Sequence, residues 1–433
     1  MNLTMSLTKS EILKALQNTI EGTYKKVLLV PPDSTRAHSG ASLITNMYYK
    51  LLTATGAKVD ILPALGSHAP MKNEDLAAFF GPDIPLDRYL VHNWRDGVVH
   101  LGEVPAQFMR EVSDGYLTDA VPVEISGHML NGYDRIFSIG QVVPHEVVGM
   151  ANYTKNIVVG CGGARFIGAS HMLGASFGIE RTLGVIDTPV RKLFDYTETH
   201  FLSKLPITYV LTVTETNSVL SSLSPEESDT QVGQQNTPMH ETNIVGLFTG
   251  HGQGGRAAFQ NAAELSQKRN IIEVGRPIKT CVVYLNPHEF HSTWLGNKAV
   301  YRTRKAIADG GHLIVIAPNV SMFGEDKILD DVIRKHGYTG RENILRLLKT
   351  EADLQSSLSA PAHLIHGSAD GRFTVSYAAP KLGKEAIEGV GYNYMCINEA
   401  MQKYNPEAMP HGFSQVDGEE VYFIYNPALG LWV

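Results

Sequence analysis

The sequence predicts two α/β domains with largely parallel sheets and an active-site cleft between them. Short β-branched strands alternate with Gly- or Pro-containing loops and helices, which is the pattern of parallel α/β sheets. A length of 433 residues suits two or three domains. A new strand–loop–helix series follows Arg276-Pro277, so we predict domains of residues 1–276 and 277–433. Two-domain α/β proteins usually hold their ligand between the halves.

The predicted elements follow in chain order. The first strand, Lys26–Val30, ends at Pro31-Pro32, and a helix follows over about 40–55. A second strand, Val59–Leu65, precedes a helix at Asn73–Phe80. Further strands are expected at Arg135–Ile139, Ile157–Val159, Ile207–Val213, Thr280–Leu285 and His312–Ala317, and an exposed loop at Ser221–Met239. Ligands of such sheets bind beyond the carboxyl ends of the strands, which points to the loops Pro31–Arg36, Gly66–Pro70 and Gly140–His145.

The composition excludes several classes of protein. A hydrophobic share of 43% with 19% charged residues is typical of a folded chain. The net charge of −7 argues against a surface for nucleic acid or anionic membrane. Neither a signal peptide nor an apolar run long enough to span a bilayer is evident. The three cysteines, Cys161, Cys281 and Cys396, fit a reducing compartment. We therefore expect a cytoplasmic enzyme with no nucleic-acid or membrane partner.

Three short motifs are weak indicators of function. The GxSxG run at residues 174–178 lacks the buried strand that a hydrolase elbow needs, so helix packing is the preferred interpretation. His288 and His291 do not have the spacing of a zinc-peptidase helix. The run Gly160–Gly163 follows a predicted strand but lacks the spacing of a dinucleotide-binding loop.

A stronger signal is a set of polar residues at the carboxyl ends of strands or in adjoining loops. Histidine moves protons near neutral pH, and arginine holds carboxylates. The set comprises Asp33, Thr35 and Arg36 after the first strand, His68 after the second, and then His145, Lys155 and His171 at spacings of ten and sixteen.

This set resembles the lactate racemase family, whose members carry a nickel-pincer nucleotide. The resemblance rests on the DxTR loop at 33–36, the GSHAP loop with His68, and the order and spacing of the last three residues of the set. It covers most of the first domain. Trp294 and Lys298 resemble, less specifically, the substrate-facing helix of that family.

The resemblance implies a role for each domain and residue. Residues 1–276 would bind the cofactor, and residues 277–433 would close the substrate cleft. The cofactor, pyridinium-3,5-bisthiocarboxylic acid mononucleotide, would be covalently attached through Lys155 and seated by Asp33 and Thr35. The other implied roles are nickel ligand for His171, acid/base catalyst for His68 and His145, and substrate binding for Arg36, Trp294 and Lys298.

The implied activity is that of an isomerase. It would be a racemase or epimerase that inverts C2 of a small 2-hydroxy carboxylate by reversible hydride transfer. Loss of hydride leaves a planar keto acid, and its return to the other face inverts the centre. Because the two enantiomers direct their hydroxyls differently, two bases are needed. The implied partners are this acid and the proteins that make and load the cofactor. A homo-oligomer is compatible with the sequence, which does not define the oligomeric state.

One segment departs from the family pattern. Asn152-Tyr153-Thr154 precede Lys155, where the family has a Gly-Gly pair. This divergence suggests that the substrate need not be lactate, and a longer polyhydroxylated acid such as an aldonate is an alternative.

Other functions remain open alternatives at this point. The chain could be an oxidoreductase that releases a 2-keto acid, or a non-catalytic protein that binds a small acid or a metal. An α/β-hydrolase using Ser176 is a more distant alternative.

Overall fold

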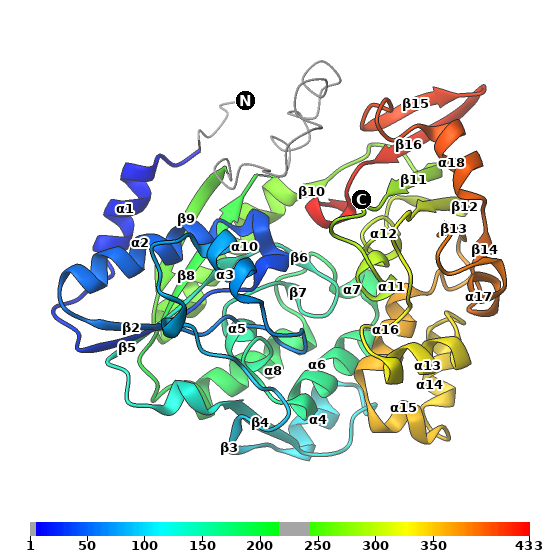
Figure 1. Cartoon of the computed structure of the whole chain (residues 1–433). Coiled ribbons are helices and arrows are strands. Elements are labelled where there is room, and N and C mark those ends of the chain that lie inside the picture. Colours follow the sequence, from blue (N-terminus) through cyan, green and yellow to red (C-terminus); the bar gives the residue numbers. More distant parts are fainter. Residues whose placement is uncertain (1–5, 216–242) are drawn as a thin grey trace. The chain divides into compact units, whose positions relative to one another are not determined.

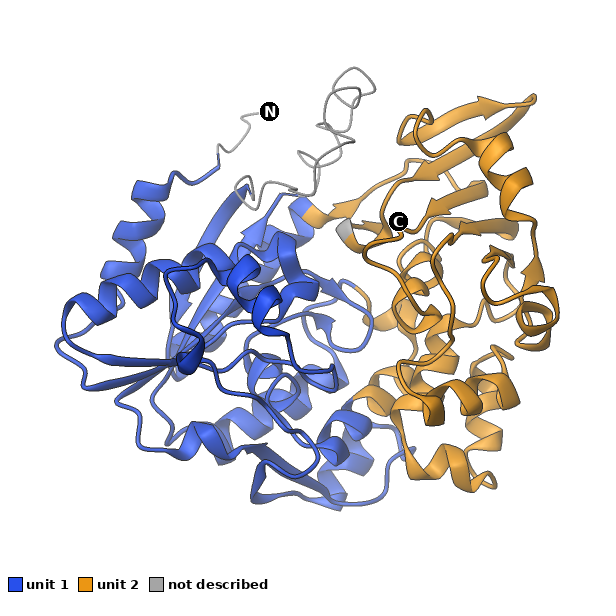
Figure 2. Ribbon diagram, in the orientation of Figure 1, with its two compact units in different colours: residues 1–170, 184–215, 235–269 blue, residues 171–183, 216–234, 270–433 orange. Residues whose placement is uncertain are grey.

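The computed structural model describes residues 6–215 and 243–433 (Figure 1). These residues form two compact units (Figure 2). Unit 1 contains the described residues within 1–170, 184–215 and 235–269, and unit 2 contains those within 171–183 and 270–433. The predicted loop Ser221–Met239 lies outside the described residues.

Unit 1 is built on a five-stranded sheet in the order β2-β1-β5-β8-β9. The first four strands are parallel, and β9 pairs antiparallel with β8. All eight residues of β8 are buried, as expected for a central strand covered on both faces. The strands are β1 (Lys26–Val30), β2 (Lys58–Ile61), β5 (Arg135–Gln141), β8 (Ile207–Thr214) and β9 (Ile244–Gly250).

Helices pack this sheet through apolar faces. In α2, Ile44, Tyr48 and Leu52 recur at one-turn spacing and are fully buried, and the Tyr48 ring stacks on Phe137 of β5 at 4.5 Å. The helices up to residue 270 are α1 (Lys9–Gln17), α2 (Ala41–Ala54), α3 (Asn73–Phe80), α4 (Ala106–Val112), α5 (Thr154–Val158), α6 (Ala164–Phe177), α7 (Ile179–Thr182), α8 (Pro189–Thr197) and α10 (Gln253–Asn270).

Short strands and helical turns lie between the main strands and helices of unit 1. Two small antiparallel pairs are β3 (Val98–Val104) with β4 (Val121–Ser126), and β6 (Pro144–His145) with β7 (Gly149–Met150). The 3-10 turns are η1 (Ser34–Ser39), η2 (Leu86–Arg88) and η3 (Gly127–Leu130), and η4 (Glu198–Leu202) is a π-helical turn that continues α8.

Unit 2 contains a six-stranded sheet in the order β14-β13-β12-β11-β16-β15. Only β15 runs antiparallel to its neighbour. Val282, Ile314 and Phe423 lie in the core on this sheet. The strands are β11 (Ile278–Tyr284), β12 (Ile307–Ile316), β13 (Thr374–Ala378), β14 (Asn393–Tyr394), β15 (Gly412–Val416) and β16 (Glu419–Ile424), and a separate parallel pair joins β10 (Ile271–Ile272) to β17 (Leu431–Trp432).

The helical elements of unit 2 after residue 290 are short. None of the helices in the two described ranges is long and apolar enough to cross a membrane. The elements are α11 (Thr293–Gly296), α12 (Lys298–Tyr301), α13 (Lys327–His336), α14 (Arg341–Leu347), α15 (Ala352–Ser356), α16 (Ser359–Gly367), α17 (Lys384–Gly389), α18 (Ile397–Tyr404) and η6 (Pro427–Leu429).

The predicted α/β class with largely parallel sheets is confirmed, and one predicted strand is wrong. Residues 157–158 of the expected strand Ile157–Val159 belong to helix α5. The side chain of Asn156 donates to the carbonyl of Val30 at 2.9 Å and to Ser138 Oγ at 3.0 Å. These tertiary bonds hold the segment as a helical turn across the ends of β1 and β5, against the strand propensity of its β-branched residues. The cleft and the domain roles stay predictions.

Candidate active site

The loops that follow β1 and β2 lie beside helix α5 in unit 1. Pro32 forms a parallel bridge with Ala64, and the backbone N–H of Gly66 donates to the carbonyl of Gly160 at 2.8 Å. Asn156 joins α5 to the ends of β1 and β5. These contacts gather the carboxyl ends of three neighbouring strands around the turn that carries Lys155, at the edge where α/β sheets place their ligands.

Asp33 and His68 form a hydrogen-bonded pair across these loops. Nδ1 of His68 lies 2.6 Å from Oδ2 of Asp33, while Thr35 Oγ1 donates to Oδ1 at 2.5 Å. Burial acts to raise the pKa of the Asp33 carboxyl, but His68, Thr35 and Arg36 outweigh it, so this pKa lies below its usual range. A carboxylate at Nδ1 keeps the proton on that nitrogen and leaves Nε2 of the neutral ring as a proton acceptor.

His145 is held in the opposite way. It is 4% exposed and ends β6, and its Nδ1 accepts the backbone N–H of Val147 at 3.1 Å. Oε2 of Glu146 lies 3.7 Å from the same nitrogen. An N–H donor at Nδ1 leaves the proton of the neutral ring on Nε2. The neutral rings of His68 and His145 therefore have complementary tautomers, one accepting and one donating through Nε2.

Lys155 is a half-buried residue in the first turn of α5. Burial, together with the positive charges of Arg36 and Arg191, lowers the pKa of its ammonium to about 7, against the opposing effects of Glu146 and Asp33. A substantial fraction of this amine is therefore unprotonated and nucleophilic at neutral pH.

Hydrogen bonds and charge interactions connect six of the nine predicted site residues. Charge interactions link Lys155 to Arg36 and Asp33, and Glu146 links it to His145. We call this set the Lys155 cluster, and it contains Asp33, Thr35, Arg36, His68, His145 and Lys155.

The other three predicted residues belong to unit 2. His171 is half-buried in the second half of α6, and its role as a metal ligand stays a prediction. The ring of Trp294 stacks on His363 at 4.3 Å, and the ammonium of Lys298 lies 5.4 Å from the ring of Phe290. Trp294 and Lys298 do not share one helix as expected, because the chain forms α11 and then α12.

The turn before Lys155 has positive φ angles, which are typical of glycine, although it contains no glycine. Asn152 has φ 70°, and Tyr153 has φ 60° with ψ −133°. Bulky L-residues rarely adopt positive φ, and each such residue stores about 1–3 kcal/mol of strain. The departure from the family pattern therefore changes the side chains of this turn but leaves a backbone that glycine would adopt readily.

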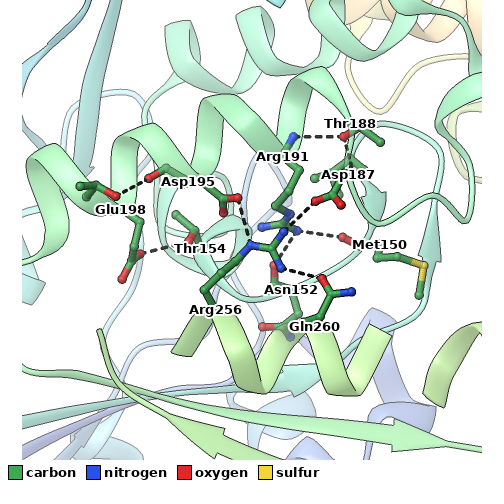
Figure 3. A network of polar contacts seen from close by, with 12 residues as sticks. Met150, Asn152, Thr154, Asp187, Thr188, Arg191, Asp195, Glu198, Arg256 and Gln260 are labelled. Carbon is green, nitrogen blue, oxygen red and sulfur yellow. Dashed lines mark hydrogen bonds and ion pairs between the residues drawn. The ribbon is translucent and has the colours of Figure 1, made fainter. Parts of the chain in front are cut away.

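Several functional candidates escaped the sequence analysis. Glu146 directly follows His145 in the chain, and this position next to a predicted catalytic residue could have identified it as a candidate. Arg191 and Glu198 contact the turn before Lys155 from α8 and η4 (Figure 3). Their partners lie about forty residues earlier in the chain, so no local pattern reveals them.

The weak motifs have structural explanations. Ser176 is buried within α6, and its hydroxyl donates to the carbonyl of Leu173 at 3.0 Å, so the helix-packing interpretation is confirmed. The run Gly160–Gly163 follows helix α5 rather than the predicted strand.

Comparisons with known proteins relate this chain to a family and a fold. Residues 4–177 match the family model described as the lactate racemase N-terminal domain. No curated protein matches the sequence. A crystal structure of a protein from Thermotoga maritima superposes with a TM-score of 0.82 at 22% identity, covering 99% of this chain and 98% of that one.

A second solved structure is that of the lactate racemase apoprotein from Thermoanaerobacterium thermosaccharolyticum. It superposes with a TM-score of 0.69 at 16% identity, covering 99% of this chain and 94% of that one. At these identities the two structures establish the fold alone. The family match confirms the predicted resemblance to the lactate racemase family over residues 4–177.

Proposed function

We propose that this protein is a racemase or epimerase that inverts C2 of a small 2-hydroxy carboxylate with a nickel-pincer nucleotide. The observation that carries the proposal is the Lys155 amine, whose pKa of about 7 gives it nucleophilic character beside Arg36 and the Asp33–His68 pair. An ordinary surface lysine, with a pKa near 10.4, would be almost fully protonated at the same pH.

The residues of the Lys155 cluster fit the proposed cofactor. Lys155 would hold it covalently through its amine, and Arg36 supplies positive charge for an anionic group nearby. His171 would be the protein ligand to nickel, since a single imidazole beside sulfur donors suits this metal. When bound, the cofactor supplies a group that accepts the C2 hydrogen with its electron pair and returns it.

The two histidines would handle the hydroxyl proton. Nε2 of His68 takes the proton from one enantiomer, and the Asp33 carboxylate stabilises the imidazolium that results. His145 would act from its protonated form: it gives its Nε2 proton to the carbonyl oxygen of the planar keto acid and is left as a neutral ring. Reaction of the opposite enantiomer reverses these roles. For this, His145 must start neutral with its ring proton moved to Nδ1, where Oε2 of Glu146 lies 3.7 Å away and would stabilise the positive charge gained when Nε2 takes the hydroxyl proton.

Arg36 would hold the substrate carboxylate while C2 pivots between the two histidines. Lys298 and Trp294 are the proposed contributions of unit 2 to substrate binding. Lactate is one candidate substrate, and the departure at Asn152-Tyr153 keeps a longer polyhydroxylated acid as the other.

The test is to produce the protein with and without the cofactor-biosynthesis proteins, and to measure intact mass, nickel content and optical rotation. We expect a mass increment on the peptide that contains Lys155, one nickel per chain, and conversion of either enantiomer to the racemate. Accumulation of a 2-keto acid would favour an oxidoreductase. Tight binding of the acid by fully loaded protein, without change in rotation, would favour a non-catalytic binding protein.

A further inference from the structure

The turn that precedes Lys155 is held by two groups of opposite charge, the buried Arg191 and the half-buried Glu198. Arg191 is 1% exposed, and its Nη2 donates to the carbonyls of Met150 at 2.9 Å and Asn152 at 3.3 Å (Figure 3). Both carbonyls belong to the strand and turn that lead directly into α5. The guanidinium therefore fixes the amino-terminal side of the turn.

Glu198 holds the other side of the turn. Its Oε2 accepts the hydroxyl of Thr154 at 3.0 Å and that of Tyr209 at 2.5 Å. Thr154 is fully buried and directly precedes Lys155. Glu198 begins the π-helical turn η4, and such turns are frequent at functional sites.

Arg191 and Glu198 come from one continuous helical segment, α8 followed by η4. Thr188 anchors the start of this segment, since its Oγ1 accepts the N–H of Arg191 and donates to the carbonyl of Val148, both at 3.1 Å. Between the two clamped positions lies Tyr153, whose ring packs against Tyr209 and Phe259. The strained residues are thus enclosed by bonds on both sides.

We propose that Arg191 and Glu198 are positioning residues that hold the Asn152–Thr154 turn in its positive-φ conformation and thereby direct the Lys155 amine into its cluster. A Gly-Gly pair would adopt this backbone without help, whereas Asn and Tyr need an external restraint. The proposal deepens the proposed function, in which Lys155 is the attachment point. The positioning itself is a property of the chain without cofactor.

The test is competitive labelling of the cofactor-free protein with acetic anhydride between pH 5 and 11, with Lys155 followed by peptide mass spectrometry. Thr154→Val removes only the hydroxyl that Glu198 accepts, and Glu198→Ala removes the acceptor. We expect the labelling midpoint of Lys155 to rise by roughly one pH unit in both variants as the half-buried amine becomes more exposed to solvent. The direct electrostatic effect of removing the Glu198 carboxylate would instead lower that midpoint. The direction of the shift therefore distinguishes a displaced amine from a lost negative charge.

The charges that face Lys155 are those of Arg36 and Asp33 from the β1 loop, Glu146 from the β6–β7 hairpin, and Arg191 from α8. All of them remain in Thr154→Val. Arg191→Met removes one positive neighbour as well as the clamp, and is expected to raise the midpoint further. Arg256→Met is the matched control, because Arg256 pairs with Asp195 and Asp187 in the same network but does not bond to the turn (Figure 3).

Asn152→Gly supplies the rescue experiment. In the Thr154→Val background it should return the Lys155 midpoint to the wild-type value, because glycine needs no clamp at φ 70°. Glu198→Gln keeps an acceptor oxygen and should behave almost as wild type. Unchanged midpoints in Thr154→Val and Glu198→Ala, with folding verified by circular dichroism, would overturn the proposal, as would a failure of Asn152→Gly to restore it. Attachment of the cofactor to Lys155 is measured in a separate experiment. A failure of the cofactor to attach would therefore contradict the proposed function and leave the positioning role of Arg191 and Glu198 unaffected.

Discussion

Nδ1 of His68 lies 2.6 Å from Oδ2 of Asp33, so the carboxylate that was expected to seat the cofactor is already engaged by a histidine. Its other oxygen accepts the hydroxyl of Thr35. Because these partners and Arg36 hold the Asp33 pKa low, the carboxylate stays charged near neutral pH and can stabilise a protonated His68. Asp33 is therefore placed to orient a base.

Replacing Asp33 with Asn should disable His68 as a base. The amide can bond to Nδ1 in either tautomer and cannot stabilise the imidazolium, so we expect kcat to fall by on the order of 10²–10⁴-fold in loaded enzyme. Asp60→Asn is the matched control, because Asp60 is equally buried but bonds to Tyr133. Nitrogen-15 NMR of the cofactor-free protein should show a change of His68 tautomer in Asp33→Asn only. Full activity in that variant would exclude the orienting role.

His68→Ala and His145→Ala should each abolish inversion. Every turnover of the proposed reaction uses both histidines, because one takes the proton from the substrate hydroxyl and the other returns a proton to form the product hydroxyl. Loss of either histidine should therefore reduce racemisation by on the order of 10²–10⁴-fold. Nickel content and the mass increment on Lys155 should stay as in wild type, because neither histidine is a proposed ligand. Near-wild-type turnover in either variant would contradict the two-base mechanism.

Lys155 should give the cofactor-free protein a specific pH dependence of stability. Its folded pKa is about 7, and an unfolded lysine has a pKa near 10.4, so the unfolded chain binds more protons between these values. The contribution of Lys155 to the free energy of unfolding therefore rises from pH 7 to about 10.4, by at most about 1.4 kcal/mol per pH unit. Because the side chain is half-buried, solvent screening makes the actual slope smaller.

The variant Lys155→Met tests this sign directly. It should be more stable than wild type below pH 7, where Lys155 is largely protonated in both states of wild type and the folded state bears a half-buried charge. This advantage should shrink as the pH rises toward 10. Urea unfolding at pH 6, 7.5 and 9 measures the difference, and the exposed Lys349→Met serves as control. A difference between Lys155→Met and wild type that is constant with pH would show that the Lys155 pKa is not lowered.

Local patterns predicted most of the fold because buried strands and their turn residues are close in the chain. The strand Lys26–Val30 and the helix Asn73–Phe80 have the predicted bounds. The error at Ile157–Val159 arose where long-range bonds of Asn156 override strand propensity. Asp33, Arg36 and His68 were predictable because they follow strand ends, whereas Lys155 lies in helix α5 and was selected by its spacing from His145. Arg191 was not, because its partners Met150 and Asn152 are distant in sequence and its burial has no local signature.

Lys298 in unit 2 provides the last prediction. If its ammonium holds the substrate carboxylate, Lys298→Met should raise KM by roughly 10–100-fold, the equivalent of one charge-assisted hydrogen bond, with a smaller change in kcat. The control is Lys327→Met, which removes an ammonium that is 86% exposed on α13. Because the carboxylate is common to both enantiomers, KM for both should rise by the same factor. A rise for one enantiomer alone would mean that Lys298 contacts the C2 substituents, and an unchanged KM for both would remove it from the substrate site.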